Sequence, residues 1–156
     1  MEISTIKNII KVFIWIAGVG MLYFFSSCKK EKPETSVVPE ITFVQIIPAT
    51  VKEYSDSLVI TISYKDGDGD LGENNPDTKN LFLTDNRIGI TYAYRIKQLA
   101  PSGSEISITG ELNIVLPQLA ITDSSNSQQT TFSIYVKDRA MNQSNVITTP
   151  AVTIYR

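Results

Sequence analysis

Side-chain polarity alternates with a period of two residues along much of this chain, and this pattern restricts the fold more than any other feature. In 58–64 (LVITISY) every second residue is apolar or aromatic, and similar alternation recurs in 90–96, 112–116 and 130–137. Strict alternation over four to eight residues indicates β-strands with one buried face. Residues 41–156 contain no segment with the 3.6-residue repeat of a long amphipathic helix. The sequence therefore predicts an all-β domain.

The number of strands points to a sandwich. Apolar segments of strand length also occur at 41–47, 81–83 and 152–154, and turn residues separate the segments every 8–15 residues. About seven or eight short strands in residues 41–156 are typical of a β-sandwich. The length fits one domain, and a core of this size needs no disulfide. We predict an Ig-like antiparallel β-sandwich over 41–156.

The N-terminus has the layout of a secretory signal. Lys7 and Lys11 precede an uncharged apolar run at 12–25, and two serines follow before Cys28. A basic start, a short apolar stretch and small residues before a cleavage site are typical of a signal peptide. The alternative is an uncleaved anchor, but this apolar stretch is shorter than the roughly 20 residues that span a bilayer. We predict that residues 1–27 are a cleaved signal peptide.

The end of this segment, 25–28 (FSSC), resembles the lipobox of bacterial lipoprotein precursors. The resemblance implies that the Cys28 thiol is acylated, and that the mature protein of a Gram-negative species carries three acyl chains, such as palmitate. Several chains make attachment to a lipid bilayer durable. Cys28 is the only cysteine in the chain. Lys29 stands where aspartate would indicate inner-membrane retention, so we expect an outer-membrane protein on the periplasmic or cell-surface face.

Residues 28–40 are predicted to form a tether between the lipid and the domain. The segment 29–40 (KKEKPETSVVPE) is charged, contains two prolines and has no periodicity, which indicates an extended linker.

The net charge of the mature chain limits its partners. The whole chain has 14 basic and 16 acidic residues, and removal of residues 1–27 takes away two lysines and one glutamate. The mature chain is therefore mildly acidic, which argues against nucleic-acid binding.

Two further segments resemble known proteins. The segment 137–145 (KDRAMNQSN) is similar to a D-x-A-x-N-x-S hairpin of bacterial Ig-like domains, although Met141 stands where glycine is usual and a left-handed turn there is in question. The segment 64–72 (YKDGDGDLG) is similar to an acidic loop of uncharacterised Gram-negative lipoproteins with one Ig-like, cadherin-like sandwich domain. These resemblances imply a fold and a location, and no activity.

The acidic loop is the one local feature that suggests chemistry. Asp66, Asp68 and Asp70 occupy alternate positions with glycines between them, and Asp77 follows. Two carboxylates about 6 Å apart repel each other by roughly 1–3 kcal/mol at an effective dielectric of 20–40. Ca²⁺ would cancel this repulsion because it binds six to eight oxygen ligands. Leu71 and the preceding strand exclude an EF-hand. We name these four acids as candidate calcium ligands; the alternative is a solvated turn.

Topology adds two candidates. If 58–64 and 130–137 are the second and sixth strands of an Ig-like sandwich, both end at the same end of the domain. The loop at 65–80 and the turn at 138–144 would then be neighbours, and Asp138 and Asn142 could complete the site. The alternative is that these two side chains only bond the backbone of their own turn.

Catalysis is not expected. The chain has no histidine, which excludes histidine triads and imidazole metal sites, and its only thiol is assigned to the lipid. Two functions stay open: a structural or adhesive module stiffened by calcium, and an accessory lipoprotein that binds carbohydrate or peptide. Tyr135, on the outer face of its strand, is the aromatic candidate for a sugar, whereas Tyr92 and Tyr94 are expected in the core. The sequence identifies no protein or glycan partner.

Overall fold

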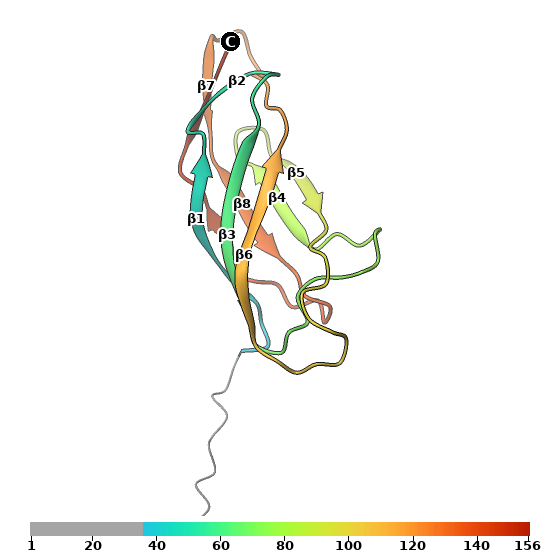
Figure 1. Cartoon of the computed structure of the whole chain (residues 1–156). Coiled ribbons are helices and arrows are strands. Elements are labelled where there is room, and N and C mark those ends of the chain that lie inside the picture. The colour runs from blue at the N-terminus through green and yellow to red at the C-terminus, as the bar shows by residue number, and fades with distance from the viewer. Residues whose placement is uncertain (1–35) are drawn as a thin grey trace, which may run out of the picture. The chain divides into compact units, whose positions relative to one another are not determined.

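A computed structural model describes residues 36–156, which fold into ten β-strands without a helix (Figure 1). The predicted all-β class is confirmed for this part of the chain, and within it no helix is long and apolar enough to cross a membrane. The predicted signal peptide, Cys28 and most of the predicted tether lie outside the described residues. In chain order the strands are β1 (Glu40–Ile47), β2 (Thr50–Lys52), β3 (Leu58–Asp66), β4 (Leu81–Asp85), β5 (Ile90–Tyr94), β6 (Ile108–Leu116), β7 (Ser127–Thr130), β8 (Phe132–Val136), β9 (Ile147–Thr148) and β10 (Val152–Tyr155).

The strand count is ten rather than the predicted seven or eight, because two long strands are each divided. Thr131 alone separates β7 from β8, and residues 149–151 separate β9 from β10. Between these breaks, the Phe132 N–H donates to Thr149 Oγ1 at 3.0 Å, so a side chain takes the place of a backbone acceptor. Both divisions raise the count above the predicted number, and β2 is a further short strand that alternation did not indicate.

The strands form two layers. One sheet has the order β1-β3-β6, a second has the order β5-β4-β8-β9, and a third has the order β2-β10-β7. All pairs are antiparallel except β2 with β10. Since β7 leads into β8 and β9 into β10, the second and third sheets belong to one layer, which lies behind β1, β3 and β6 (Figure 1). The chain is a β-sandwich.

Alternation along the strands places the core between the layers. In β3, Leu58, Ile60 and Ile62 are fully buried. The facing layer contributes the buried side chains of β4 and β8, where Leu83 pairs with Ile134. The two tyrosines of β5 are partly buried and pack against this core, as predicted. The largest fully buried side chains are Phe132, Ile41, Leu58, Ile60, Ile62, Leu71, Leu83, Ile134, Ile154, Val51, Val136 and Val152.

Three segments that are distant in sequence meet at one end of the sandwich. β3 ends at Asp66 and β8 ends at Val136, and β1 begins here, with Glu40 opposite Lys65. The Asn145 side chain joins two of these segments, because its amide accepts from the Ile41 N–H and donates to the Ile41 carbonyl, both at 2.9 Å. We call this the loop end of the domain, and it holds the acidic residues singled out in the sequence.

Candidate metal centre

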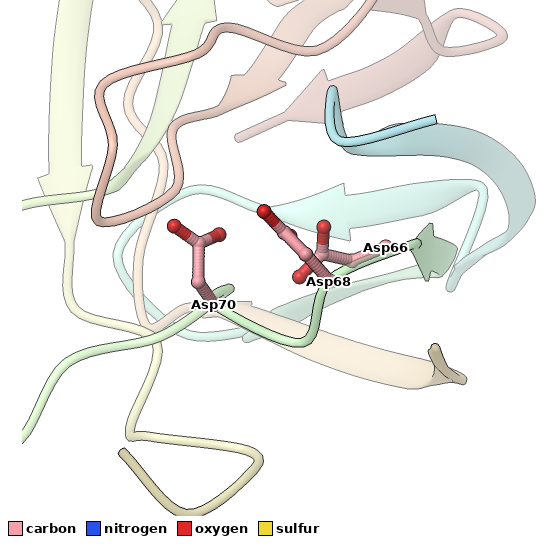
Figure 2. A group of neighbouring side chains, drawn as sticks. All are labelled: Asp66, Asp68 and Asp70. Carbon is pink, nitrogen blue, oxygen red and sulfur yellow. The ribbon is translucent and has the colours of Figure 1, made fainter. Parts of the chain in front are cut away.

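Three aspartates converge at the loop end. Asp66 is the last residue of β3, and Asp68 and Asp70 follow in the loop. One carboxylate oxygen from each lies within 4.8 Å of the others, and Figure 2 shows the three side chains grouped along one turn of the loop. Gly69 allows this turn because its φ is +75° and the Ile106 carbonyl lies against it, where a side chain would collide. We call the three side chains the aspartate cluster.

The cluster contains buried oxygens that no donor satisfies. Asp66 is fully buried; its Oδ2 accepts from the Leu71 N–H at 2.8 Å, but its Oδ1 has no hydrogen-bond partner. Buried Oδ1 atoms of Asp68 and Asp70 are also without partners. Buried polar groups in native proteins are nearly always hydrogen-bonded, and an unpaired one costs free energy. Three such oxygens at one point therefore require an explanation.

A second buried acid shows that this domain can supply hydrogen-bond donors to a buried carboxylate. Asp85 at the end of β4 is as buried as Asp66, but it accepts from Thr130 Oγ1 at 2.5 Å. It also accepts from the Arg87 N–H at 3.0 Å and from the guanidinium at 2.9 Å. No ion pair of this kind involves the aspartate cluster among the described residues. The missing partners are a property of the cluster and not of buried acids in this domain.

Electrostatics disfavours full ionisation of the cluster. The pKa of Asp66 is raised from 3.8 to about 6, mainly by burial and in addition by the charges of Asp68 and Asp70, against the hydrogen bond from Leu71. Burial and the charges of Asp138 and Asp68 likewise raise the pKa of Asp70. A bound cation would remove both effects, because it replaces lost hydration and cancels the repulsion.

The cluster contacts the turn after β8, as topology predicted. The Arg139 N–H donates to the Asp70 carbonyl at 3.3 Å, and the Ala140 N–H donates to Asp70 Oδ2 at 3.1 Å. The Arg139 guanidinium donates to the carbonyls of Gly72 at 3.0 Å and Gly69 at 3.4 Å. The nearest cationic side chain thus holds the loop backbone, and these bonds fix the loop beside the turn.

Asp138 and Asn142 are beside the cluster but bond each other. Asp138 is buried, and its two oxygens accept from the Asn142 N–H at 2.8 Å and from the Asn142 side-chain amide at 2.9 Å. These bonds agree with the alternative in which the pair stabilises its own turn. Met141 between them has φ +69°, so the left-handed turn forms although glycine is absent. Asp138 remains close enough to raise the pKa of Asp70.

Two other predicted site residues do not join a common site. Asp77 is exposed and outside the cluster; its N–H donates to Asn75 Oδ1 at 3.0 Å within a separate turn. Tyr135 faces outward as predicted, but its ring stacks on Phe82 with centroids 4.8 Å apart. Lys137 Nζ lies 5.9 Å from the centroid of the same Phe82 ring. One face of Tyr135 is therefore covered by protein.

Sequence reasoning did not find the backbone donors that shape the cluster. The N–H groups of Leu71 and Ala140 donate to the carboxylates of the cluster, and neither residue type indicates this role in a sequence.

Comparisons with protein-family models, with curated proteins and with solved structures found no match to this chain. Any function assigned to the loop end is therefore argued from its own residues.

Proposed function

We propose that residues 41–156 are a non-catalytic Ig-like module of an exported, lipid-anchored outer-membrane protein, and that the aspartate cluster binds Ca²⁺, which stabilises the module. The observation that supports calcium is the aspartate cluster itself: one carboxylate oxygen of each residue lies within 4.8 Å of the others, and each residue has a buried Oδ1 without a hydrogen-bond partner. The N-terminal sequence ending at Cys28 supports export and lipid attachment. Attachment places the module at the periplasmic or cell-surface face of the membrane.

The spacing of the oxygens favours calcium over magnesium. Ca²⁺ binds oxygens at about 2.3–2.6 Å, so two ligands of one ion can be up to about 5 Å apart. The 4.8 Å limit of the cluster fits this range. Mg²⁺ binds at about 2.0–2.1 Å, which allows little more than 4 Å between opposite ligands, and it requires octahedral geometry. The cluster would have to contract to hold Mg²⁺.

Other ligands are available beside the cluster. Ca²⁺ requires six to eight oxygens, and three carboxylates supply between three and six. Asp138 on the neighbouring turn offers a fourth carboxylate, and Asn142 offers an amide oxygen. Water and backbone carbonyls can complete the set. The ion would then join the loop after β3 to the turn after β8, two segments that are about 70 residues apart in sequence.

A non-catalytic role agrees with the chemistry of the chain. The sequence has no histidine, and its only thiol is assigned to the lipid. The carboxylates lie in one cluster rather than on opposite sides of a cleft, as glycoside hydrolysis requires. A carbohydrate-binding role has less support, because the candidate platform Tyr135 is stacked on Phe82 and stacking against a sugar needs a free aromatic face.

Calcium titration of the purified protein tests the proposal. Ca²⁺ at about 100 times its dissociation constant should add roughly 2.7 kcal/mol to the free energy of unfolding, and Mg²⁺ should add much less. The double variant Asp68→Asn, Asp70→Asn should lose most of this response, and without calcium it should be at least as stable as the wild type. Asp77→Asn removes an exposed acid from the same loop and should respond like the wild type.

Asp138→Asn reports whether the turn contributes to the site. A weaker calcium response in this variant would support a fourth carboxylate ligand, whereas an unchanged response would restrict the site to the loop. If the wild-type protein melts at the same temperature in excess calcium and in EDTA, the calcium proposal is wrong, and the acidic segment is a solvated turn.

A further inference from the structure

Four exposed apolar side chains lie on the segments that meet at the loop end. Their exposed fractions are 68% for Met141, 53% for Val37, 50% for Ile106 and 42% for Val38. Single exposed apolar residues are ordinary, but these four come from three separate segments. The Val37 carbonyl accepts from the Asn142 amide at 3.4 Å, and the backbone of Ile106 lies against Gly69. We call these four side chains the apolar rim.

The backbone of Met141 is strained in a way that keeps its side chain exposed. Its φ of +69° lies in the left-handed region, which is unfavourable for a non-glycine residue. Met141 is also the most exposed large apolar residue among those described. Backbone strain of this kind is frequent at functional sites. The strained turn therefore holds an exposed apolar side chain at the loop end.

The described chain begins at the apolar rim, which identifies the partner. Residues 29–35 separate Cys28 from Ser36, so a fully extended chain places Ser36 within roughly 29 Å of the lipid-bearing residue. The nine residues of β3 run from the opposite end of the domain to the cluster, a length of about 30 Å. The chain therefore enters the domain at the loop end, and a tether of this length keeps that end within reach of the bilayer.

We propose that the apolar rim docks on the phospholipid bilayer that holds the lipid anchor of the same chain, and that the cation in the aspartate cluster is required for docking. This inference rests on the proposed function. Without a cation, the carboxylates of the cluster repel anionic head groups. Bound Ca²⁺ removes this repulsion, and phosphate oxygens, which are hard ligands like carboxylates, can replace water among its ligands. The rim side chains then enter the apolar boundary of the membrane.

Fluorescence quenching on vesicles tests the docking. The full-length lipidated chain carrying Met141→Cys is labelled with a bimane fluorophore, because acylation leaves residue 141 as the only free thiol. It is inserted into vesicles of phosphatidylethanolamine and phosphatidylglycerol that contain nitroxide-labelled lipid. Tyr54→Cys is the matched control: Tyr54 is 62% exposed, has φ +57° and lies in the turn before β3, at the opposite end.

In calcium, quenching of the label at residue 141 should be at least about twofold stronger than quenching of the label at residue 54, because a docked side chain lies in the head-group region. EDTA should remove this difference. Ile106→Cys provides a second rim position if the turn does not tolerate cysteine at 141, and it should behave in the same way.

Three results would overturn the proposed cation-dependent docking, and each is distinguishable from failure of the proposed function. Equal quenching at both positions, on vesicles with which the protein floats, means that the rim does not touch lipid although the anchor is intact. Quenching that persists in EDTA means that the cation has no part in docking. A label at residue 141 that is shielded from water but not quenched by lipid means that a protein or a second copy covers the rim. Flotation tests the anchor, and calorimetric titration with Ca²⁺ tests the cluster.

Discussion

Asp66 should make the calcium-free protein less stable as pH rises, and Asp66→Asn should remove this dependence. The carboxyl group is fully buried, and its pKa is raised from 3.8 to about 6. A folded-state pKa above the unfolded value means that the folded protein holds its proton more tightly. Below about pH 3, both states are largely protonated and the group has little effect. Between about pH 4 and pH 6 the unfolded chain ionises first, so stability falls as pH rises.

The size of the effect follows from the shift. A shift of about two pKa units corresponds to about 3 kcal/mol, at 1.36 kcal/mol per unit. Asparagine at position 66 does not ionise, and its amide oxygen can still accept from the Leu71 N–H. The free energy of unfolding of the calcium-free variant, minus that of the wild type, should therefore grow from near zero below about pH 3 to about 3 kcal/mol at pH 7.

Urea unfolding in calcium-depleted buffer measures this difference. Linear extrapolation gives the free energy of unfolding at each pH, and subtraction of the two proteins cancels the titration of other groups, such as Asp123, whose hydrogen bonds with Ser125 lower its pKa. In saturating calcium the order should reverse, because only the wild type retains the Asp66 carboxylate as a ligand. A difference that stays constant between pH 4 and pH 7 would refute the reasoning.

Three further changes test other parts of the molecule. Cys28→Ala should abolish incorporation of a clickable fatty acid and leave the precursor uncleaved; unchanged labelling would refute the lipobox assignment. Gly72→Ala should destabilise the protein severalfold more than Gly103→Ala, for which about 1 kcal/mol is expected: both glycines have positive φ, but only at Gly72 would a Cβ collide with the Lys97 carbonyl. Equal thermal shifts would contradict this. Arg87→Ala should cost about 3–5 kcal/mol in urea unfolding because it leaves buried Asp85 unpaired; a loss below about 1 kcal/mol would show that the pair is dispensable.

Alternating polarity predicted the long strands, because a strand that buries one face has an apolar side chain at every second position. It identified β3 and β8, whose inward residues are buried. It did not predict β7, whose sequence SQQT is polar. There, Gln128 accepts from the Arg87 guanidinium at 2.7 Å, so hydrogen bonding rather than apolar burial holds the strand. Gly110 lies within β6 because the Tyr64 ring occupies the space of its missing side chain, a contact that no local pattern reveals.

The candidate site was predictable where it depends on local spacing or on topology. Alternate spacing indicated the three clustered aspartates, and strand direction indicated that the turn after β8 lies beside them. Asp77 was proposed because it follows the three alternating aspartates in the sequence. In this structure Glu73 Oε1 accepts from the N–H groups of Asn74 and Asn75, and the chain forms a separate turn that takes Asp77 away. The sequence left a left-handed turn at Met141 in question because glycine is absent, and hydrogen bonds between Asp138 and Asn142 hold that turn.

The direction in which β1 leaves the sandwich determines how the domain carries mechanical load. The described chain begins at the loop end, and its C-terminus lies at the opposite end (Figure 1). Tension between a membrane anchor and a partner held near the C-terminus would act along the strands. β1 pairs with β3 from Glu40 to Ile47, so these backbone hydrogen bonds would be loaded together in shear rather than opened one at a time. Forced unfolding depends on the unfolding rate, and shear loading keeps that rate low.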